Sequence, residues 1–318
     1  MNSFLALRAL PDRLGSMRKR FVIAALASAL IAGALVIWLA IPSPKAPDNP
    51  IIRGKLLSEW ITEMEFGSNY ATASSVLKEV GTNAIPFYLQ MATAHDTPLE
   101  SAWFSVASRQ HFFKVKHTQP NDLNNASMAA FRQLGSNGWV AIPELIRAYD
   151  RAYSPNSQNV IAFILGDFGP PARAAIPSLL RETSNKVDFV RNSAYRALGG
   201  IHEDAPRAVP ALIRGLNDTY DTSRYHSAQG LGNFGTNAHA AVPALVSFIK
   251  TNVPSSVSAA PPSPGMKSIA PRPSPSAGWS ADAGQTALNS LRNIDPAAAA
   301  QLEAELRTNS SSPSSTSR

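Results

Sequence analysis

The sequence contains no cysteine in its 318 residues. This absence excludes disulfide bonds, thiolate catalysis and cysteine-held metals, because each of these needs the side-chain sulfur. It does not identify the redox compartment. Charged residues are also scarce, at 16% of the chain, whereas 44% of the residues are hydrophobic. A chain of this length and composition can bury a sizeable core.

The net charge of +7 is concentrated at one end of the chain. Residues 1–20 contain five basic side chains and one acidic side chain, so the remainder carries only +3. A nucleic-acid-binding domain needs a strongly basic surface to neutralise phosphates. The modest charge of the remainder therefore predicts that nucleic acid is not a partner.

Two short motifs suggest chemistry, but each lacks the context that the chemistry needs. Ser75 and Lys78 form a Ser-x-x-Lys without the Ser-Asp-Asn and Lys-Thr-Gly elements of penicillin-binding proteins. Residues 230–235 read Gly-x-Gly-x-x-Gly, but a dinucleotide site needs a strand before the glycines, and here we expect a helix to end. The first motif therefore predicts an exposed helix face and the second a turn.

The histidines show no spacing typical of metal ligands. They are His95, His111, His117, His202, His226 and His239. No nucleophile, base and acid can be grouped from the sequence, and no phosphate-binding loop is present. We therefore expect no catalytic residue, no cofactor and no metal site, and we expect that the protein is not an enzyme.

One phrase returns at a nearly constant spacing between residues 141 and 250. It reads Ala-(Ile/Val)-Pro-x-Leu-(Ile/Leu/Val), and its prolines are Pro143, Pro177, Pro210 and Pro243. The positions one before and two, three and six after each proline are almost all apolar, which is the pattern of a helix with one buried face. Proline suits the first turn of a helix, so each copy predicts a helix that begins there.

Another helix is expected before each of these copies. The stretches 159–165, 191–198 and 224–231 end in Leu-Gly, with glycines at Gly166, Gly199 and Gly232. These glycines fit either a close helix contact or a helix end, while Asp188 and Asp221 fit N-caps. We call the earlier helix of each pair the first helix and the proline-headed helix the second helix. Helix pairs at this period predict an all-α fold, an α-solenoid.

The predicted solenoid covers residues 54–306 and is irregular at both ends, as expected of terminal repeats. Its start shows helices at 56–66 and 71–80, then an early copy of the phrase at Pro86, and an extra helix at 99–116. Its end shows helices at 284–294 and 297–306, with Asp295 as an N-cap between them. The Pro- and Ser-rich insert 252–278 and the tail 307–318 are predicted to be disordered.

Residues 21–41 form an uncharged apolar run. At about 1.5 Å per residue a helix of this length spans roughly 31 Å, enough to cross a bilayer. The basic segment 1–20 precedes it, so the N-terminus is expected in the cytoplasm. The proline-rich stretch 42–53 then forms a stiff spacer. The alternative is a signal peptide cut near residues 27–29, giving a secreted protein. Under both interpretations the solenoid is expected outside the cytoplasm, which in a Gram-negative cell is the periplasm.

These features resemble the HEAT-repeat family, in particular the short repeats also found in phycobilisome lyase-like proteins. The units carry Gly, then eight residues, then the Ala-(Ile/Val)-Pro phrase. The opening Gly-Lys-Leu-Leu-Ser-Glu-Trp at 54–60 is similar to the start of membrane-anchored HEAT-repeat proteins of bacteria. The resemblance implies a binding platform for a protein partner. It also implies that the second helices line the concave surface of the solenoid.

One column of charge stands out on the second helices. Four residues after successive prolines lie Arg147, Arg181 and Arg214. At 100° per residue this position points away from the apolar stripe, so the side chains are expected in solvent. They are interpreted either as a solubilising row paired with acids such as Glu144, or as a groove for an acidic segment of a partner or an anionic glycan or lipid headgroup. The favoured function is a membrane-anchored, non-catalytic interaction scaffold, and the alternative is a ligand-handling protein similar to bilin lyases.

Overall fold

The computed structural model describes residues 49–67, 69–107, 119–252 and 279–311. The chain divides into two units, Met1–Asn49 and Pro50–Arg318, and the elements below lie in the second unit. The predicted basic segment 1–20 and membrane span 21–41 lie outside the described residues, as does nearly all of the insert 252–278. Within the described part, no helix combines the length and the hydropathy needed to cross a membrane.

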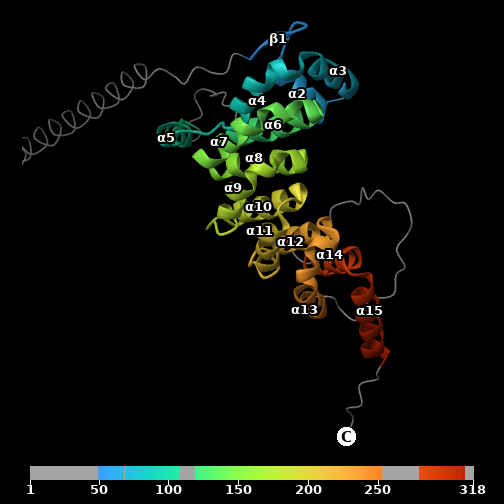
Figure 1. Ribbon diagram of the computed structural model, residues 1–318. Coiled ribbons are helices and arrows are strands. Elements are labelled where there is room, and N and C mark those ends of the chain that lie inside the picture. Colours follow the sequence, from blue (N-terminus) through green and yellow to red (C-terminus); the bar gives the residue numbers. More distant parts are fainter. Residues whose placement is uncertain (1–48, 68, 108–118, 253–278, 312–318) are drawn as a thin grey trace, which may run out of the picture. The chain divides into compact units, whose positions relative to one another are not determined.

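The described residues are mostly helical, with one short pair of strands at the start (Figure 1). The strands are β1 (Ile51–Ile52) and β2 (Lys55–Leu56). The α-helices are α2 (Leu57–Phe66), α3 (Tyr70–Val80), α4 (Ile85–Ala92), α5 (Pro98–Ala107), α6 (Pro120–Leu134), α7 (Ile142–Arg151), α8 (Pro155–Phe168), α9 (Ile176–Glu182), α10 (Asp188–Ile201), α11 (Ala205–Gly215), α12 (Asp221–Asn233), α13 (Val242–Asn252), α14 (Trp279–Ile294) and α15 (Pro296–Ser311). Short 3-10 helices are η1 (Gly81–Ala84), η2 (Gly135–Ala141), η3 (Pro170–Ala175) and η4 (Gly235–Ala241).

From α6 to α15 the helices alternate between two layers. The first helices α6, α8, α10, α12 and α14 pack one against the next, and α7, α9, α11 and α13 are the second helices that join them (Figure 1). Residues 135–250, where strands would have contradicted the repeat interpretation, contain helices and their connecting turns. The predicted α-solenoid of helix pairs is thereby confirmed.

The predicted apolar stripes lie in the core. On α11, Val209, Leu212 and Leu216 (the residue after its last turn) are buried, and on α13 the buried residues include Leu245 and Ile249. They belong to one continuous cluster of buried side chains that runs from α2 to α15. Stacking therefore buries a hydrophobic face that no single helix pair could bury alone.

The repeated glycines mark places where first helices nearly touch. A Cβ atom on Gly199 would lie 2.5 Å from the Cα of Gly230, and one on Gly166 would lie 2.9 Å from the Cα of Ala197. The sequence allowed either a helix end or a close contact, and the structure shows the close contact. Successive second helices, in contrast, touch one another at few places. The first-helix layer is therefore the more closely packed of the two.

The position of proline is confirmed for three of the four copies and wrong for the third. Pro143, Pro177 and Pro243 lie in the first turns of α7, α9 and α13, whereas Pro210 lies inside α11. In the other three units, a glycine with positive φ begins or directly precedes a 3-10 helix that leads to the proline. The third unit has His202, also with positive φ, at that place. In this unit the turn between the two helices ends at residue 204, so α11 begins at Ala205, more than one helical turn before Pro210.

The predicted N-caps are also displaced by one position. Asp188 and Asp221 are the first residues of α10 and α12, and neither helix has a side-chain cap hydrogen bond. The two carboxylates instead pair with arginines three residues later, Arg191 and Arg224. Asp295, in contrast, is confirmed as a cap, because its Oδ1 accepts a hydrogen bond of 3.0 Å from the Ala298 N–H.

The start of the domain differs from the prediction, because the spacer was expected to continue to residue 53. Strands β1 and β2 pair in antiparallel fashion, and the turn residues Arg53 and Gly54 both have positive φ, as two-residue hairpin turns require. The Trp60 Nε1–H donates a hydrogen bond of 2.9 Å to the Ile52 carbonyl. Helix α2 thereby holds the hairpin, and the folded domain includes residues 51–53.

Two further boundaries differ from the sequence prediction. The extra helix expected at 99–116 begins at Pro98 as α5 and is described to Ala107, and residues 108–118 lie outside the described part. The following helix α6, the first helix of the unit containing Pro143, was not predicted. The tail was expected to be disordered from residue 307, but α15 continues to Ser311. Residues 312–318 lie outside the description.

Candidate interaction surfaces

The three arginines of the predicted column are exposed, as expected, on successive second helices. Arg147 on α7 forms an ion pair with Glu144 on the same helix. Arg181 on α9 reaches back to Asp150 of α7, with an Nη2–Oδ1 distance of 2.6 Å. The structure gives Arg214 on α11 no ion pair with any described residue. Nearby carboxylates therefore balance the charges of Arg147 and Arg181, whereas the charge of Arg214 has no such partner among the described residues.

A second charged cluster, on the first helices, was missed by the sequence reasoning. Asp167 of α8 accepts hydrogen bonds of 2.6 Å from Arg132 on α6 and 2.8 Å from Arg196 on α10. The Arg196 guanidinium also lies 4.3 Å from the ring centroid of Phe163. Phe163 and Arg196 occupy the same place in successive units, so the repeat period could have indicated that they are neighbours on adjacent helices.

A cavity of about 260 Å³ lies beside this cluster. It is lined by the charged side chains Arg132 and Asp167 and by Trp139, which is 45% exposed. Two phenylalanines, Phe131 and Phe168, form its apolar wall and meet edge to face at 6.2 Å. The cavity thus places an opposite-charge pair beside an exposed aromatic ring.

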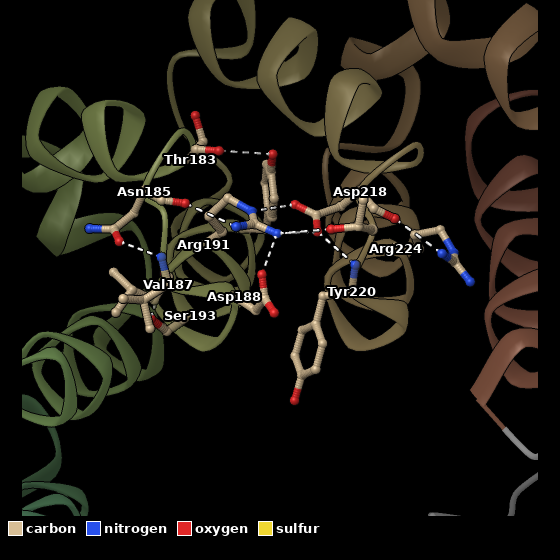
Figure 2. A network of polar contacts seen from close by, with 12 residues as sticks. Thr183, Asn185, Val187, Asp188, Arg191, Ser193, Asp218, Tyr220 and Arg224 are labelled. Carbon is tan, nitrogen blue, oxygen red and sulfur yellow. Dashed lines mark hydrogen bonds and ion pairs between the residues drawn. The ribbon is translucent and has the colours of Figure 1, made fainter. Parts of the chain in front are cut away.

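A third group of polar residues is buried between two units (Figure 2). Arg191 at the start of α10 donates from Nε and Nη2 to the two carboxylate oxygens of Asp218, both at 2.8 Å. The Arg191 and Asp218 side chains are only 14% and 5% exposed. Arg191 also donates to Asp188 at 2.9 Å and to the Asn185 carbonyl at 2.9 Å. The Arg191 guanidinium thus links α10 to the loop that precedes α12, the first helix of the next unit.

The electrostatics of Asp218 follow from these contacts. Burial raises the pKa of its carboxyl, but hydrogen bonds from Arg191 and from the Tyr220 backbone N–H outweigh burial and hold the pKa below its usual value. The same hydrogen bond from Arg191 raises the pKa of the guanidinium. Both groups are therefore charged at neutral pH, and their role is to link neighbouring repeats.

His226 on α12 is the most strongly shifted of the described histidines. Burial is the main cause that lowers its pKa to about 4. A contact with Gln229 at 3.3 Å opposes this shift, and the nearby positive charge of Arg196 contributes to it. The imidazole is neutral at physiological pH. Among the residues that the structure describes, no group of three or more potential ligands could hold a metal ion.

The two apparent motifs have the structural explanations expected of them. Residues 230–233 form the last turn of helix α12 and residues 234–235 follow it, so a helix and no strand precedes the motif. Ser75 and Lys78 are exposed on α3. His111 and His117 lie outside the described residues.

The repeated units can now be compared with known families. Residues 142–232 match the family model described as HEAT repeats. This segment runs from the start of α7 to the end of α12 and contains the buried Arg191–Asp218 pair. The HEAT-repeat resemblance is thereby confirmed for this part of the chain. No curated protein matches the chain.

Proposed function

We propose that this chain is a non-catalytic interaction scaffold. Its HEAT-like helix pairs present columns of side chains to a protein partner, and residues 21–41 hold the array at a membrane with the repeats outside the cytoplasm. HEAT repeats generally mediate protein–protein interaction, and the HEAT match supports this part of the proposal. The membrane attachment rests on the uncharged run and the basic segment before it.

The observation that carries the proposal is the repeated placement of exposed arginines. The stack sets Arg147, Arg181 and Arg214 on three successive second helices. A rigid row of guanidinium groups can bind acidic side chains of a partner segment, because arginine forms two parallel hydrogen bonds with a carboxylate. The internal pairs of Arg147 and Arg181 are solvent-exposed and cost little to exchange for partner carboxylates.

The arginine column fixes which layer we assign to the partner. The HEAT-repeat resemblance implies that the second helices line the concave surface. Arg147, Arg181 and Arg214 lie on these helices. We therefore place the partner on the second-helix layer, along the column.

Crosslinking in intact cells tests the proposal. The triple variant Arg147→Glu, Arg181→Glu and Arg214→Glu should lose the partner that crosslinks to the wild-type chain. The matched control Lys78→Glu, Arg173→Glu and Lys186→Glu makes the same change in charge at exposed positions off the column and should keep it. Equal capture by both triple variants would refute the arginine column as the binding surface.

The topology is tested separately. Reporter fusions at the two ends should show a cytoplasmic N-terminus and an exported C-terminus. The mass of the mature chain distinguishes a retained anchor from the alternative of signal-peptide cleavage near residues 27–29. A cytoplasmic C-terminal reporter would refute export.

A further inference from the structure

Two arginines occupy equivalent places in neighbouring units. Arg191 lies in the first turn of α10 and Arg224 in the first turn of α12, one repeat later. Each donates from Nη1 to the backbone carbonyl six residues earlier, at 2.9 Å for Arg191 and 3.0 Å for Arg224. Each also donates from Nη2 to an aspartate three residues earlier, at 2.9 Å and 2.5 Å. Within their own units the two side chains are held in the same way.

The two arginines differ in what the next unit supplies. Arg191 has the carboxylate of Asp218, which accepts two hydrogen bonds. The position one repeat after Asp218 is Thr251, which has no carboxylate. Among the described residues, no carboxylate of the following unit binds Arg224. The charge pair that Arg191 makes with the loop before the next first helix therefore has no counterpart at Arg224, although the Arg224 side chain is only 22% exposed.

A cavity of about 440 Å³ lies where the missing carboxylate would be. Arg224 and Asp218 line one side, and Ser247, Phe248 and Thr251 of α13 line the other. The carboxylate oxygens of Asp218 are occupied by Arg191 and by the Tyr220 N–H, so Asp218 is not available to Arg224. The cavity thus combines one partly buried cation, two hydroxyl groups and an aromatic wall.

The adjoining segment of this chain cannot complete the charge pair. Residues 253–278 follow the last residue of α13 and contain neither aspartate nor glutamate. Lys250, which lies close by in the sequence, is paired with Glu305 of α15 at 2.7 Å. This segment and Lys250's partner therefore supply no carboxylate to Arg224.

We propose that this cavity is a carboxylate-binding site. A carboxylate enters between α12 and α13 and binds the Arg224 guanidinium as Asp218 binds Arg191, with the Ser247 hydroxyl as a further donor. The carboxylate belongs either to an acidic side chain of a partner polypeptide or to a small free acid. The polypeptide form rests on the proposed scaffold function, whereas the free-acid form does not.

Titration of the purified full chain in non-ionic detergent tests the site with two named probes. One is a blocked peptide, acetyl-Ala-Ala-Glu-Ala-Ala-amide, whose control has glutamine in place of glutamate. The other is N-acetylglutamate, whose control is N-acetylglutamine amide, so that neither control carries a carboxylate. We expect saturable binding of at least one acidic probe and none of its control. Arg224→Gln should weaken binding roughly tenfold or more. Arg207→Gln, the same charge change at an exposed position, should leave it unchanged.

Thr251→Asp provides the sharpest test, because it restores the carboxylate that the next unit lacks. This variant should raise the unfolding midpoint and abolish probe binding while Arg224 is intact. Thr251→Asn, of similar size but uncharged, should still bind. Absence of saturable binding to the wild type, or unchanged binding by Thr251→Asp, would overturn the proposal.

The two probes separate the possible sources of the carboxylate. Binding of the peptide alone assigns the site to a partner's acidic side chain, and binding of N-acetylglutamate alone assigns it to a free acid. This titration needs no cellular partner. Its failure is therefore distinguishable from failure of the crosslinking test, which reports on the arginine column.

Discussion

At the scale of single residues, the Arg191–Asp218 pair has the most demanding surroundings. Both side chains are largely removed from water, so the folded state must compensate two desolvated charges. Two hydrogen bonds between the pair, together with those from Tyr220 and to Asp188, provide that compensation. Loss of one member would leave the other buried without its counter-charge.

Asp218→Asn should therefore destabilise the protein by about 3 kcal/mol, as seen when one partner of a buried ion pair is removed. The measurement is the free energy of unfolding in urea at pH 7. Asp188→Asn is the matched control, because Asp188 contacts the same guanidinium but is 57% exposed, and it should cost less than about 1 kcal/mol. Equal effects of the two variants would contradict the importance of burial.

His226 makes stability depend on pH. Its pKa is about 4 when folded and 6.5 as an ordinary histidine, so the unfolded chain binds a proton more readily. The stabilising contribution is complete above pH 6.5 and is lost as pH falls from 6.5 through 4. We expect a loss of up to about 3 kcal/mol over that range. His226→Gln should flatten urea unfolding midpoints measured between pH 7 and pH 4, and an unchanged pH profile in this variant would contradict the assignment.

At the scale of the helices, the close approach of α10 and α12 depends on the absence of a side chain at Gly199. Gly199→Ala should destabilise the protein by about 1 to 3 kcal/mol, because its Cβ would meet the backbone of Gly230. Helix propensity alone gives the opposite sign, a gain of about 1 kcal/mol. Gly235→Ala is the comparison, because it meets no atom within 4 Å and is strained only by its positive φ. The thermal unfolding midpoint of Gly199→Ala, compared with the wild type, shows whether the close contact or helix propensity has the larger effect.

Pro210 permits a test of the one misplaced proline. It lies inside α11, where it removes a backbone hydrogen bond, whereas Pro243 lies in the first turn of α13. Pro210→Ala should therefore raise stability by about 1 kcal/mol, and Pro243→Ala should not. Calorimetric unfolding midpoints of both variants provide the measurement. A larger gain for Pro243→Ala would contradict the difference between the two sites.

The helix pairs were predictable because their signals are local and repeated. Apolar spacing after each proline identified the second helices, and the constant repeat period identified the pairing of layers. The early start of α11 was not predictable from the phrase, because nothing in the phrase marks Asp204, a second residue with positive φ after which α11 begins. Helix α6 was missed because its unit differs in length from the later repeats.

The candidate surfaces were predictable only in part, for a physical reason. Exposure of the arginine column follows from helix geometry, but the partners of its members depend on neighbouring helices. Arg181 pairs with Asp150 of the preceding second helix, and no short motif signals that contact. The cluster of Arg132, Asp167 and Arg196 likewise joins three helices. Contacts of this kind appear only when the register between units is known.

At the scale of the whole array, α14 and α15 close the stack. Gly232 of α12 lies directly against Ser290 of α14, and α14 also packs on α13. A chain that ends at Asn252 would expose the apolar faces of α12 and α13 to water. We expect this truncated chain to unfold several degrees lower and to self-associate, as measured by differential scanning fluorimetry and light scattering. An unchanged midpoint and a monomeric truncated chain would show that the cap is dispensable.

Helices α12 and α14 lie side by side although residues 253–278 separate α13 from α14 in the sequence. We therefore expect the two parts to recognise each other without the covalent link between residues 252 and 279. Separately expressed fragments, 1–252 and 279–318, should reassemble into one particle when mixed. A fluorescent domain spliced into the same interval should report on the protein in living cells while leaving the repeats undisturbed.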